Sequence, residues 1–374
     1  MEEPRRIVLI LGNGFDLDLG LKTSYKDFWE SEFCPKEYPA PLIHHLNRCW
    51  HDNLDAVKWY DLENELLNYY ASIPNPKLPQ DIISEEERRF LEDFKAYKVG
   101  YGIYNDQMGI LQSLFEKRII VHSNNVLCPV DAPYQIDCSR TPQERDERAL
   151  KLIKEGLCKY LRSIDKPLPK NDTMAFQLLL TIAKAGEAGD FIEIFTFNYT
   201  QVPYIGKDVK GIPIHYMHGC CEDGKIIVGT RDDTSMVHEY DFLQKVMDDT
   251  FTPPDIVSAL KDADEVIIFG HSLGENDRQY FAPFFLRQAD EDNTTRKDIT
   301  IFTRDSKSKV EIKRALQKMT NGKLSALYSI NQPVIIRTNN LIEDQQLLFN
   351  FLVNHSLNKR SAEDVLGKLL PARQ

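Results

Sequence analysis

Short aliphatic runs that end in polar or glycine turns constrain the fold of this chain more than any other feature. Ile7–Leu11 is continuous and aliphatic, as expected of a strand buried in a parallel sheet, and the turn Gly12-Asn13-Gly14 follows it. Strands that alternate with helical patterns predict an α/β fold with a Rossmann-like, mostly parallel sheet that has helices on both faces. The other expected strands are Phe191–Phe197, Ile212–Met217, Lys225–Gly229, Glu265–Phe269, Asp298–Thr303 and Pro333–Arg337.

The segment between residues 38 and 186 differs in character from the rest of the chain. Asp61–Ile73 and Asp172–Lys184 have helical periodicity, and Thr141-Pro142-Gln143-Glu144 is a capping box with proline at the first helical position. We therefore expect a mainly helical insert at 38–186, placed after the first βα unit. The α/β domain then consists of 1–37 and 187–374, and 374 residues suffice for two domains.

Composition argues against several classes of protein. The 46 Lys and Arg against 57 Asp and Glu give a net charge of −11, which disfavours non-specific binding to nucleic acid or to anionic membranes. We expect no signal peptide and no membrane span, because no apolar run reaches roughly 18 residues. Seven cysteines without a CxxC pair predict reduced thiols, not a disulfide framework or a zinc site. The expectation is a cytoplasmic protein without a metal.

Four short segments with glycine or polar side chains follow expected strands from distant parts of the sequence. In an open parallel sheet, ligands bind outside the carboxyl ends of the strands, so these segments are expected to form one site. They are Gly12-Asn13-Gly14-Phe15-Asp16, Phe197-Asn198-Tyr199-Thr200, His218-Gly219 and Gly270-His271-Ser272-Leu273.

The first of these segments lets the backbone approach a ligand, and its amides face a phosphate if a helix follows. Asp16 would repel a phosphate beside it, so it suits a ribose hydroxyl or a helix cap instead. A plain strand-to-helix turn without any ligand is an equally good interpretation of Gly12–Asp16.

Asn198 and His218 are the candidates for catalysis. An amide directly after a strand orients a water or a ribose hydroxyl without adding charge, and histidine is the natural proton acceptor near neutral pH. The period of two places His215 on the opposite face from His218. Structural interpretations stay open for both candidates: an Asx-turn or cap for Asn198, and packing for a lone histidine.

Two rival sites follow from other motifs. The segment 270–274 reads Gly-x-Ser-x-Gly, which makes Ser272 a candidate hydrolase nucleophile with His355 as the only histidine after it. Asp61 and Glu65 lie four residues apart near Glu63, and paired carboxylates can hold a metal. With Asp16 they would suit a metal-dependent nuclease or phosphotransferase, although a solvated helix face explains the pair more simply.

Five segments carry a resemblance to a known family over about three quarters of the chain. They are ILGNGFDLDLGLKTSYKDFW (10–29), WYDLENEL (59–66), FTFNYT (195–200), HYMHG (215–219) and FGHSLGENDRQYF (269–281). In this order they resemble the AbiH family, the phage abortive-infection proteins. AbiH proteins are in turn similar, at a distance, to the sirtuin-type NAD-binding fold.

The sirtuin likeness implies roles for individual residues. Asn198 matches the asparagine that orients the nicotinamide ribose or the attacking water, and His218 matches the general base. Gly270 and Ser272 match the segment that holds the dinucleotide. The first loop departs from the sirtuin Gly-Ala-Gly pattern, and the zinc-ribbon cysteines are absent. The resemblance therefore implies NAD cleavage and not protein deacetylation.

The function implied is an antiphage protein that cleaves NAD at the nicotinamide–ribose bond, with NAD as its substrate or ligand. The alternatives are a non-catalytic module that senses NAD or ADP-ribose, and the metal-dependent enzyme described above. A phage-derived trigger and a homo-oligomer are left open. The residues expected to bind the nucleotide are Gly12, Asn13, Gly14, Phe15, Asp16, Gly270, His271, Ser272 and Asp277.

Overall fold

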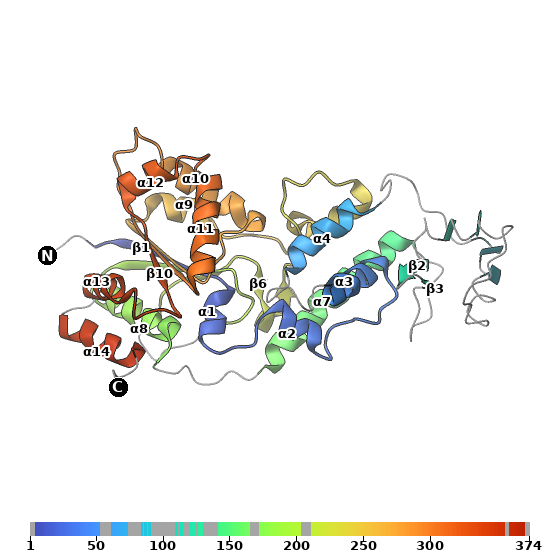
Figure 1. The fold of residues 1–374 in the computed structure, drawn as a ribbon, viewed down its shortest axis with the longest axis horizontal. Coiled ribbons are helices and arrows are strands. Elements are labelled where there is room, and N and C mark those ends of the chain that lie inside the picture. Colours follow the sequence, from blue (N-terminus) through green and yellow to red (C-terminus); the bar gives the residue numbers. More distant parts are fainter. Residues whose placement is uncertain are drawn as a thin grey trace. The chain divides into compact units, whose positions relative to one another are not determined.

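The computed structural model divides the chain into two compact units, one formed by Met1–Ser24, Leu161–Ile226 and Thr252–Gln374, the other by Tyr25–Tyr160 and Ile227–Phe251 (Figure 1). The domain boundaries predicted at 37/38 and 186/187 mark changes in the character of the sequence. They do not coincide with the ends of these two units and stay a prediction. In the described part, no helix is long and apolar enough to cross a membrane. The residues described are 4–52, 61–73, 84, 86–87, 89–90, 109–110, 113–114, 120–123, 126–129, 141–164, 172–202, 211–355 and 359–370.

The first unit is built on a six-stranded sheet in which neighbouring strands are parallel, in the order β10-β9-β8-β1-β4-β5. Among the strands of this sheet, the chain moves from β1 to one side and then returns to β8 on the other. This is the strand order of dinucleotide-binding folds, with its switch point beside β1. The predicted α/β fold with a parallel sheet is confirmed. The strands are β1 (Arg6–Leu11), β4 (Phe191–Thr196), β5 (Ile214–Tyr216), β8 (Glu265–Phe269), β9 (Asp298–Thr303) and β10 (Val334–Arg337).

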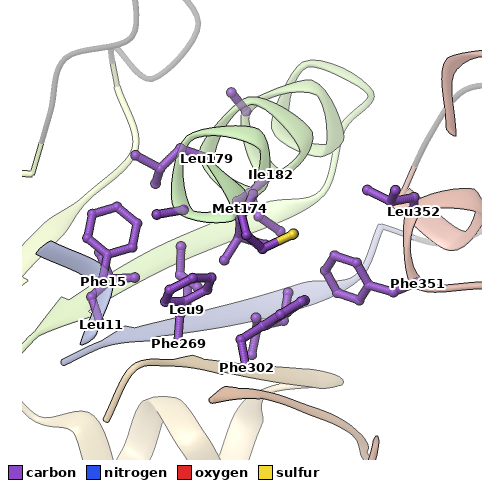
Figure 2. Packing of buried hydrophobic residues seen from close by; sticks show 14 of the residues in the cluster. Leu9, Leu11, Phe15, Met174, Leu179, Ile182, Phe269, Phe302, Phe351 and Leu352 are labelled. Carbon is purple, nitrogen blue, oxygen red and sulfur yellow. The ribbon is translucent and has the colours of Figure 1, made fainter. Parts of the chain in front are cut away.

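Helices cover both faces of this sheet, because alternate residues of each strand point to opposite sides. In β1, Leu9 and Leu11 pack with α8, α13 and α14, whereas Val8 and Ile10 pack with α9, α10 and α11. Figure 2 shows the first cluster, in which side chains of the sheet, Phe269 and Phe302 among them, lie beside α8. The helices of this unit are α1 (Asn13–Asp18), α8 (Met174–Glu187), α9 (Ile256–Asp262), α10 (Arg278–Gln288), α11 (Ser306–Met319), α12 (Leu324–Asn331), α13 (Gln345–His355) and α14 (Lys359–Leu369).

One expected strand is wrong as a member of this sheet. Lys225–Gly229 contributes only the two residues of β7 (Lys225–Ile226), which pair antiparallel with β6 (Gly219–Cys220). Gly219 and Gly224 have φ values of +77° and +72°, so the chain turns back on itself there before a longer strand can form.

The second unit contains most of the helical insert expected between the first βα unit and β4, but α8, which was expected within 38–186, belongs to the first unit and packs on its sheet. Its elements are α2 (Tyr25–Glu30), α3 (Pro41–Asp52), α4 (Leu62–Ala71), the hairpin β2–β3 (Ile120–Ser123 and Val126–Pro129) and most of α7 (Pro142–Ser163). The predicted capping box begins α7, since the Thr141 hydroxyl accepts from the Glu144 amide at 3.2 Å and the Glu144 carboxylate accepts from the Thr141 amide at 2.7 Å.

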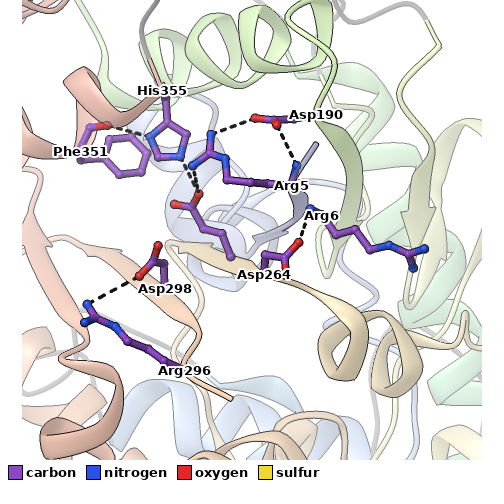
Figure 3. A network of polar contacts seen from close by, with 9 residues as sticks. Arg5, Arg6, Asp190, Asp264, Arg296, Asp298, Phe351 and His355 are labelled. Atoms are coloured by element: carbon purple, nitrogen blue, oxygen red, sulfur yellow. Dashed lines mark hydrogen bonds and ion pairs between the residues drawn. The ribbon is translucent and has the colours of Figure 1, made fainter. Parts of the chain in front are cut away.

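A network of charged side chains closes the amino edge of the sheet in the first unit (Figure 3). Glu265, the first residue of β8, lies 2.8 Å from His355 Nε2 at the end of α13 and 3.3 Å from the Arg5 guanidinium. Arg5 also pairs with Asp190, just before β4, at 2.9 Å. The network fixes α13 to the starts of the central strands, at the edge opposite the loops considered next.

Candidate functional site

The loops after β1, β4, β5 and β8 bring polar side chains together at the carboxyl edge of the sheet, next to the switch point. The structure thus unites the four segments singled out in the sequence, although up to 260 residues separate them along the chain. Polar groups are rarely buried without a specific role, so this edge is the candidate site. The buried polar members, each with 6% or less of its surface exposed, are Asp16, Asn198, Thr200, His218 and His271.

Asp16 is a buried carboxyl group inside α1, and it does not cap that helix. Its oxygens accept hydrogen bonds from Asn198 Nδ2, at 2.9 Å, and from the Thr200 hydroxyl. Burial raises the pKa of Asp16 from 3.8 to about 6, although the hydrogen bonds from Thr200 and Asn198 act to lower it. Asp16 therefore gains or loses its charge close to neutral pH.

Asn198 is held by bonds to distant parts of the chain, so it does not form the local Asx-turn considered above. Its Nδ2 donates to the Asp16 carboxylate and, at 3.1 Å, to the carbonyl of Gly12. Because both partners are acceptors, the amide nitrogen must face them and Oδ1 must face away. Asn198 Oδ1 is buried and has no hydrogen-bond partner. Leaving such a buried acceptor unsatisfied costs about 1–3 kcal/mol.

His218 and His271 share one carboxylate. His218 Nε2 lies 3.4 Å from Asp277 Oδ1, and His271 Nε2 lies 3.3 Å from Asp277 Oδ2. His271 Nδ1 accepts a hydrogen bond from the Leu273 amide at 3.0 Å, which places the His271 proton on Nε2, toward Asp277. The Asp277 carboxylate therefore lies between the two imidazole rings.

Asp277 contacts the two histidines from the N-cap position of α10, where an aspartate side chain usually accepts a hydrogen bond from the helix backbone. It occupies the N-cap of α10, but its side chain makes no capping hydrogen bond. A capping aspartate contributes about 1 kcal/mol to helix stability, and here that contribution is replaced by the two histidine contacts. His215, by contrast, stacks on Phe195 and lies 3.4 Å from Glu193, and it does not take part in the contacts of His218 and His271 with Asp277.

Phe197 and Thr200 belong to this site although their roles were missed from the sequence. The Phe197 ring packs edge-on against His218 and His271, at centroid distances of 5.4 and 4.4 Å, and so fixes both imidazoles. Thr200 binds the Asp16 carboxylate. Both residues lie in the quoted segment FTFNYT, but their partners are remote in sequence, so no local pattern reveals the pairings.

The glycines of the first loop serve close packing between two loops. A Cβ on Gly12 would lie 2.5 Å from His271 Cα, and one on Gly14 would lie 2.7 Å from Gly270 Cα. The Gly12 and Gly14 amides donate to the carbonyls of Phe269 and Gly270, both at 2.9 Å, and the Phe15 amide donates to Gly12. These three amides are therefore used within the protein and do not form a phosphate cradle.

The serine-hydrolase alternative is wrong. His355, the only histidine that follows Ser272, binds Glu265 at the amino edge of the sheet, whereas Ser272 follows the carboxyl end of β8. The strand between them spans about 13 Å at about 3.3 Å per residue, so the two side chains cannot form a catalytic pair. The left-handed residues of this turn are Gly270 and Leu273, with φ of 66° and 53°, and not Ser272.

The carboxylates proposed for a metal-dependent enzyme do not converge. Asp61 caps α4 by accepting from the Asn64 amide at 3.0 Å, and Glu63 pairs with the buried Lys245 at 3.1 Å. Glu65 instead lies 3.6 Å from His45 Nε2. Each carboxylate thus has a different partner: Asp61 is an exposed helix cap, as a solvated face would have it, whereas Glu65 is partly buried beside His45.

A comparison with known protein families agrees with the segments quoted above. The family model described as Bacteriophage abortive infection AbiH matches residues 8–297, which include the insert and all the residues of the carboxyl-edge site. No curated protein and no solved structure shows a significant match to the chain. Because the family match covers more than half of the 374 residues, the chain belongs to the AbiH family of bacteriophage abortive infection proteins.

Proposed function

We propose that this AbiH protein acts in antiphage defence by hydrolysing NAD at the bond between nicotinamide and ribose. The observation that carries the proposal is the buried Oδ1 of Asn198, which has no hydrogen-bond partner. Asp16 holds the Asn198 side chain in place. The next residue in the chain, Tyr199, packs its ring near that of His218. Most buried polar side-chain atoms have a hydrogen-bond partner, so a buried oxygen without one supports a role in binding. The same edge supplies a histidine paired with a carboxylate, as proton transfer requires.

The reaction sets clear demands on such a site. The bond between ribose C1′ and the nicotinamide nitrogen breaks with its electron pair leaving on nicotinamide, and the ribose passes through an oxocarbenium-like state. Water then adds to C1′ and loses a proton, which gives nicotinamide, ADP-ribose and one proton. The site must therefore hold the ribose, favour positive charge at C1′ and accept a proton from water.

The carboxyl-edge residues meet these demands in separate roles. Asn198 Oδ1 accepts a hydrogen bond from a ribose hydroxyl or from the attacking water and so orients it. His218 takes the proton from water, and Asp277 stabilises the resulting imidazolium. Asp16, ionised above about pH 6, places a negative charge behind Asn198 that favours the positive ribose.

In this proposal the ribose of the nucleotide lies against Asn198 and His218, and the strand order of the sheet is consistent with a dinucleotide. The amides of Gly12, Gly14 and Phe15 are occupied, so the pyrophosphate takes its hydrogen bonds from other groups of this edge. The exposed Ser272 hydroxyl at the β8 turn is one such donor. A distant relation to the sirtuin-type fold is part of this proposal.

Chromatography of the full chain incubated with NAD tests the proposal. Wild-type protein is expected to release nicotinamide and ADP-ribose, and His218→Ala and Asn198→Ala are each expected to lower turnover about 100-fold or more. His215→Ala is the matched control, because this histidine precedes His218 by three residues but contacts Phe195 and Glu193. It should keep the wild-type rate.

Two results would contradict the proposal. Equal rates of NAD loss with the wild type and with His218→Ala would show that His218 is not the general base. If NAD levels stay constant in infected cells that express the chain, while calorimetry shows that the purified protein binds ADP-ribose, the sensing alternative replaces catalysis. Circular dichroism of each variant identifies any that fails to fold, and such a variant is left out of both assays.

A further inference from the structure

We propose that His45, Cys49 and Glu65 bind a transition-metal ion, zinc above all, that links α3 to α4 in the second unit. None of these residues belongs to the carboxyl-edge site, and the proposal does not depend on NAD hydrolysis. The sequence pattern predicted no metal, because it contains no CxxC pair, and the spacing of these three residues does not reveal a mixed set of imidazole, thiol and carboxylate.

The three ligand atoms converge because of helix geometry. His45 and Cys49 are four residues apart on α3 and therefore lie on the same face of that helix. His45 Nε2 lies 3.4 Å from Cys49 Sγ and 3.6 Å from Glu65 Oε2, and all three ligand atoms lie within 4.8 Å of one another. Among the residues that the structure describes, this is the one such group of three or more.

The two separations measured from His45 Nε2 are close to those of atoms bound to one tetrahedral ion. Zinc binds imidazole nitrogen at about 2.0–2.1 Å, thiolate sulfur at about 2.3 Å and carboxylate oxygen at about 2.0–2.2 Å. At a tetrahedral angle these bond lengths place nitrogen and oxygen about 3.4 Å apart, and sulfur and nitrogen about 3.6 Å apart. His45 Nε2 lies 3.6 Å from the Glu65 oxygen and 3.4 Å from the Cys49 sulfur, within about 0.2 Å of each value.

Two contacts meet at one imidazole nitrogen, a hydrogen bond with the Cys49 thiol and an ion-pair contact with Glu65. The separation of 3.6 Å between His45 Nε2 and Glu65 Oε2 exceeds the range of an N–H···O hydrogen bond. One imidazole nitrogen has either one hydrogen or one lone pair, so it cannot serve a thiol and a carboxylate equally well. A cation between the three atoms interacts with all of them.

The charges and the chemistry of the ligands favour zinc. A thiolate and a carboxylate cancel the charge of a divalent ion, so the loaded site is neutral, which suits the burial of His45. Thiolate and imidazole select zinc-like ions over magnesium or calcium. Three protein ligands leave a fourth position for water.

The frame around the site is already fixed by a third helix. The buried Asp146 of α7 accepts hydrogen bonds from the Leu42 amide of α3, at 2.8 Å, and from the Tyr69 hydroxyl of α4. The Tyr69 ring in turn packs against His45 at 5.3 Å between centroids. Helices α3 and α4 are therefore held in register independently of the metal, and the ligands need little rearrangement to bind it.

Cobalt titration of the chelator-treated full chain tests the proposal. We expect one Co²⁺ per chain with a sulfur-to-cobalt charge-transfer band in the near ultraviolet, and displacement of cobalt by zinc. Cys49→Ser should abolish the band, and His45→Gln or Glu65→Gln should weaken metal binding at least tenfold. The matched controls are His44→Gln, which alters the neighbouring residue of the same helix, and Cys34→Ser; burial raises the pKa of Cys34 to about 12. Both controls should bind as wild type does.

The outcomes separate cleanly. A wild-type chain with native circular dichroism that takes up no cobalt overturns the proposal, whether or not the variants fold. A charge-transfer band that persists in Cys49→Ser, or that disappears equally in Cys34→Ser, also overturns it. Metal uptake is read without NAD, so a chain that fails to hydrolyse NAD can still confirm this site.

Discussion

Several side chains at the carboxyl edge give up interactions that would stabilise the fold. Asp277 leaves α10 without its usual cap, and Asn198 Oδ1 is buried without a partner. Leu273 is buried with φ of 53°, a conformation that costs a branched side chain roughly 1–3 kcal/mol. Such local losses, gathered at one edge of a sheet, indicate that this edge is kept for binding and chemistry.

Asp16 makes a prediction about stability and pH. Its native pKa is raised to about 6 from 3.8, so the native state holds this proton more tightly than the unfolded state does. The stability gained from the protonated form is complete below about pH 4 and is lost as pH rises through 6. The difference corresponds to about 3 kcal/mol. Asp16→Asn should therefore be the more stable chain above pH 6, by up to this amount.

Urea unfolding of both chains from pH 4 to pH 8 measures this difference. Asp292→Asn, at an exposed position of the same unit, is the control and should follow the wild type throughout. A constant difference between wild type and Asp16→Asn at all pH values would contradict the prediction. The variant should also lose NAD hydrolysis, which would show that the charge is kept for activity at the expense of stability.

At the scale of elements, the turn after β1 and the turn after β8 pack so closely that their glycines cannot be replaced. A Cβ on Gly270 would lie 2.4 Å from the Phe15 amide nitrogen and 2.5 Å from Gly14 Cα, and Gly270 has φ of +66°. Gly270→Ala should therefore lower the free energy of unfolding by about 3 kcal/mol or more.

Gly20→Ala separates the two causes. Gly20 also has a positive φ, +84°, but an added Cβ meets nothing within 4 Å. This variant should lose only about 1 kcal/mol in the same urea titration. Equal losses for Gly20→Ala and Gly270→Ala would mean that backbone conformation, and not the contact between the two turns, sets the requirement for glycine.

Helix α13 is bound to the amino edge of the sheet through His355 and Glu265, on the side opposite the candidate site. A substitution at His355 should therefore change stability without changing activity. His355 Nδ1 donates to the Phe351 carbonyl at 2.7 Å and Nε2 faces Glu265, so glutamine cannot replace both bonds. His355→Gln should lower the free energy of unfolding by about 2 kcal/mol and leave NAD turnover unchanged. A large loss of turnover in a chain that remains folded would place His355 in the chemistry after all.

At the scale of the whole molecule, the two proposals fall on different units. The carboxyl-edge site belongs to the first unit, and His45, Cys49 and Glu65 belong to the second. A bound ligand slows amide hydrogen exchange where it stabilises the native state. ADP-ribose should therefore slow exchange in the loops after β1, β4, β5 and β8, and zinc should slow exchange in α3 and α4. Protection by ADP-ribose confined to the second unit would contradict the site assignment.

The elements of this protein follow from local patterns, and for that reason the sequence alone determined most of them. Glu265–Phe269 and Asp298–Thr303 form strands with the predicted bounds. Periodicity and caps act over a few residues, so a single sequence contains them. The rule that parallel strands gather ligands at their carboxyl ends then placed the loops with Asn198 and His218 at one edge.

Only the tertiary structure decided which partner each polar side chain takes. Asp277 stands where a helix cap is expected, and only the fold turns its carboxylate to His218 and His271. Glu65, considered in the sequence either as a partner of Asp61 or as part of a solvated helix face, lies beside His45 instead. The physical reason is that a hydrogen bond or an ion pair depends on positions within a few tenths of an ångström. Those positions are set by how whole helices and strands pack, which no local stretch of sequence contains.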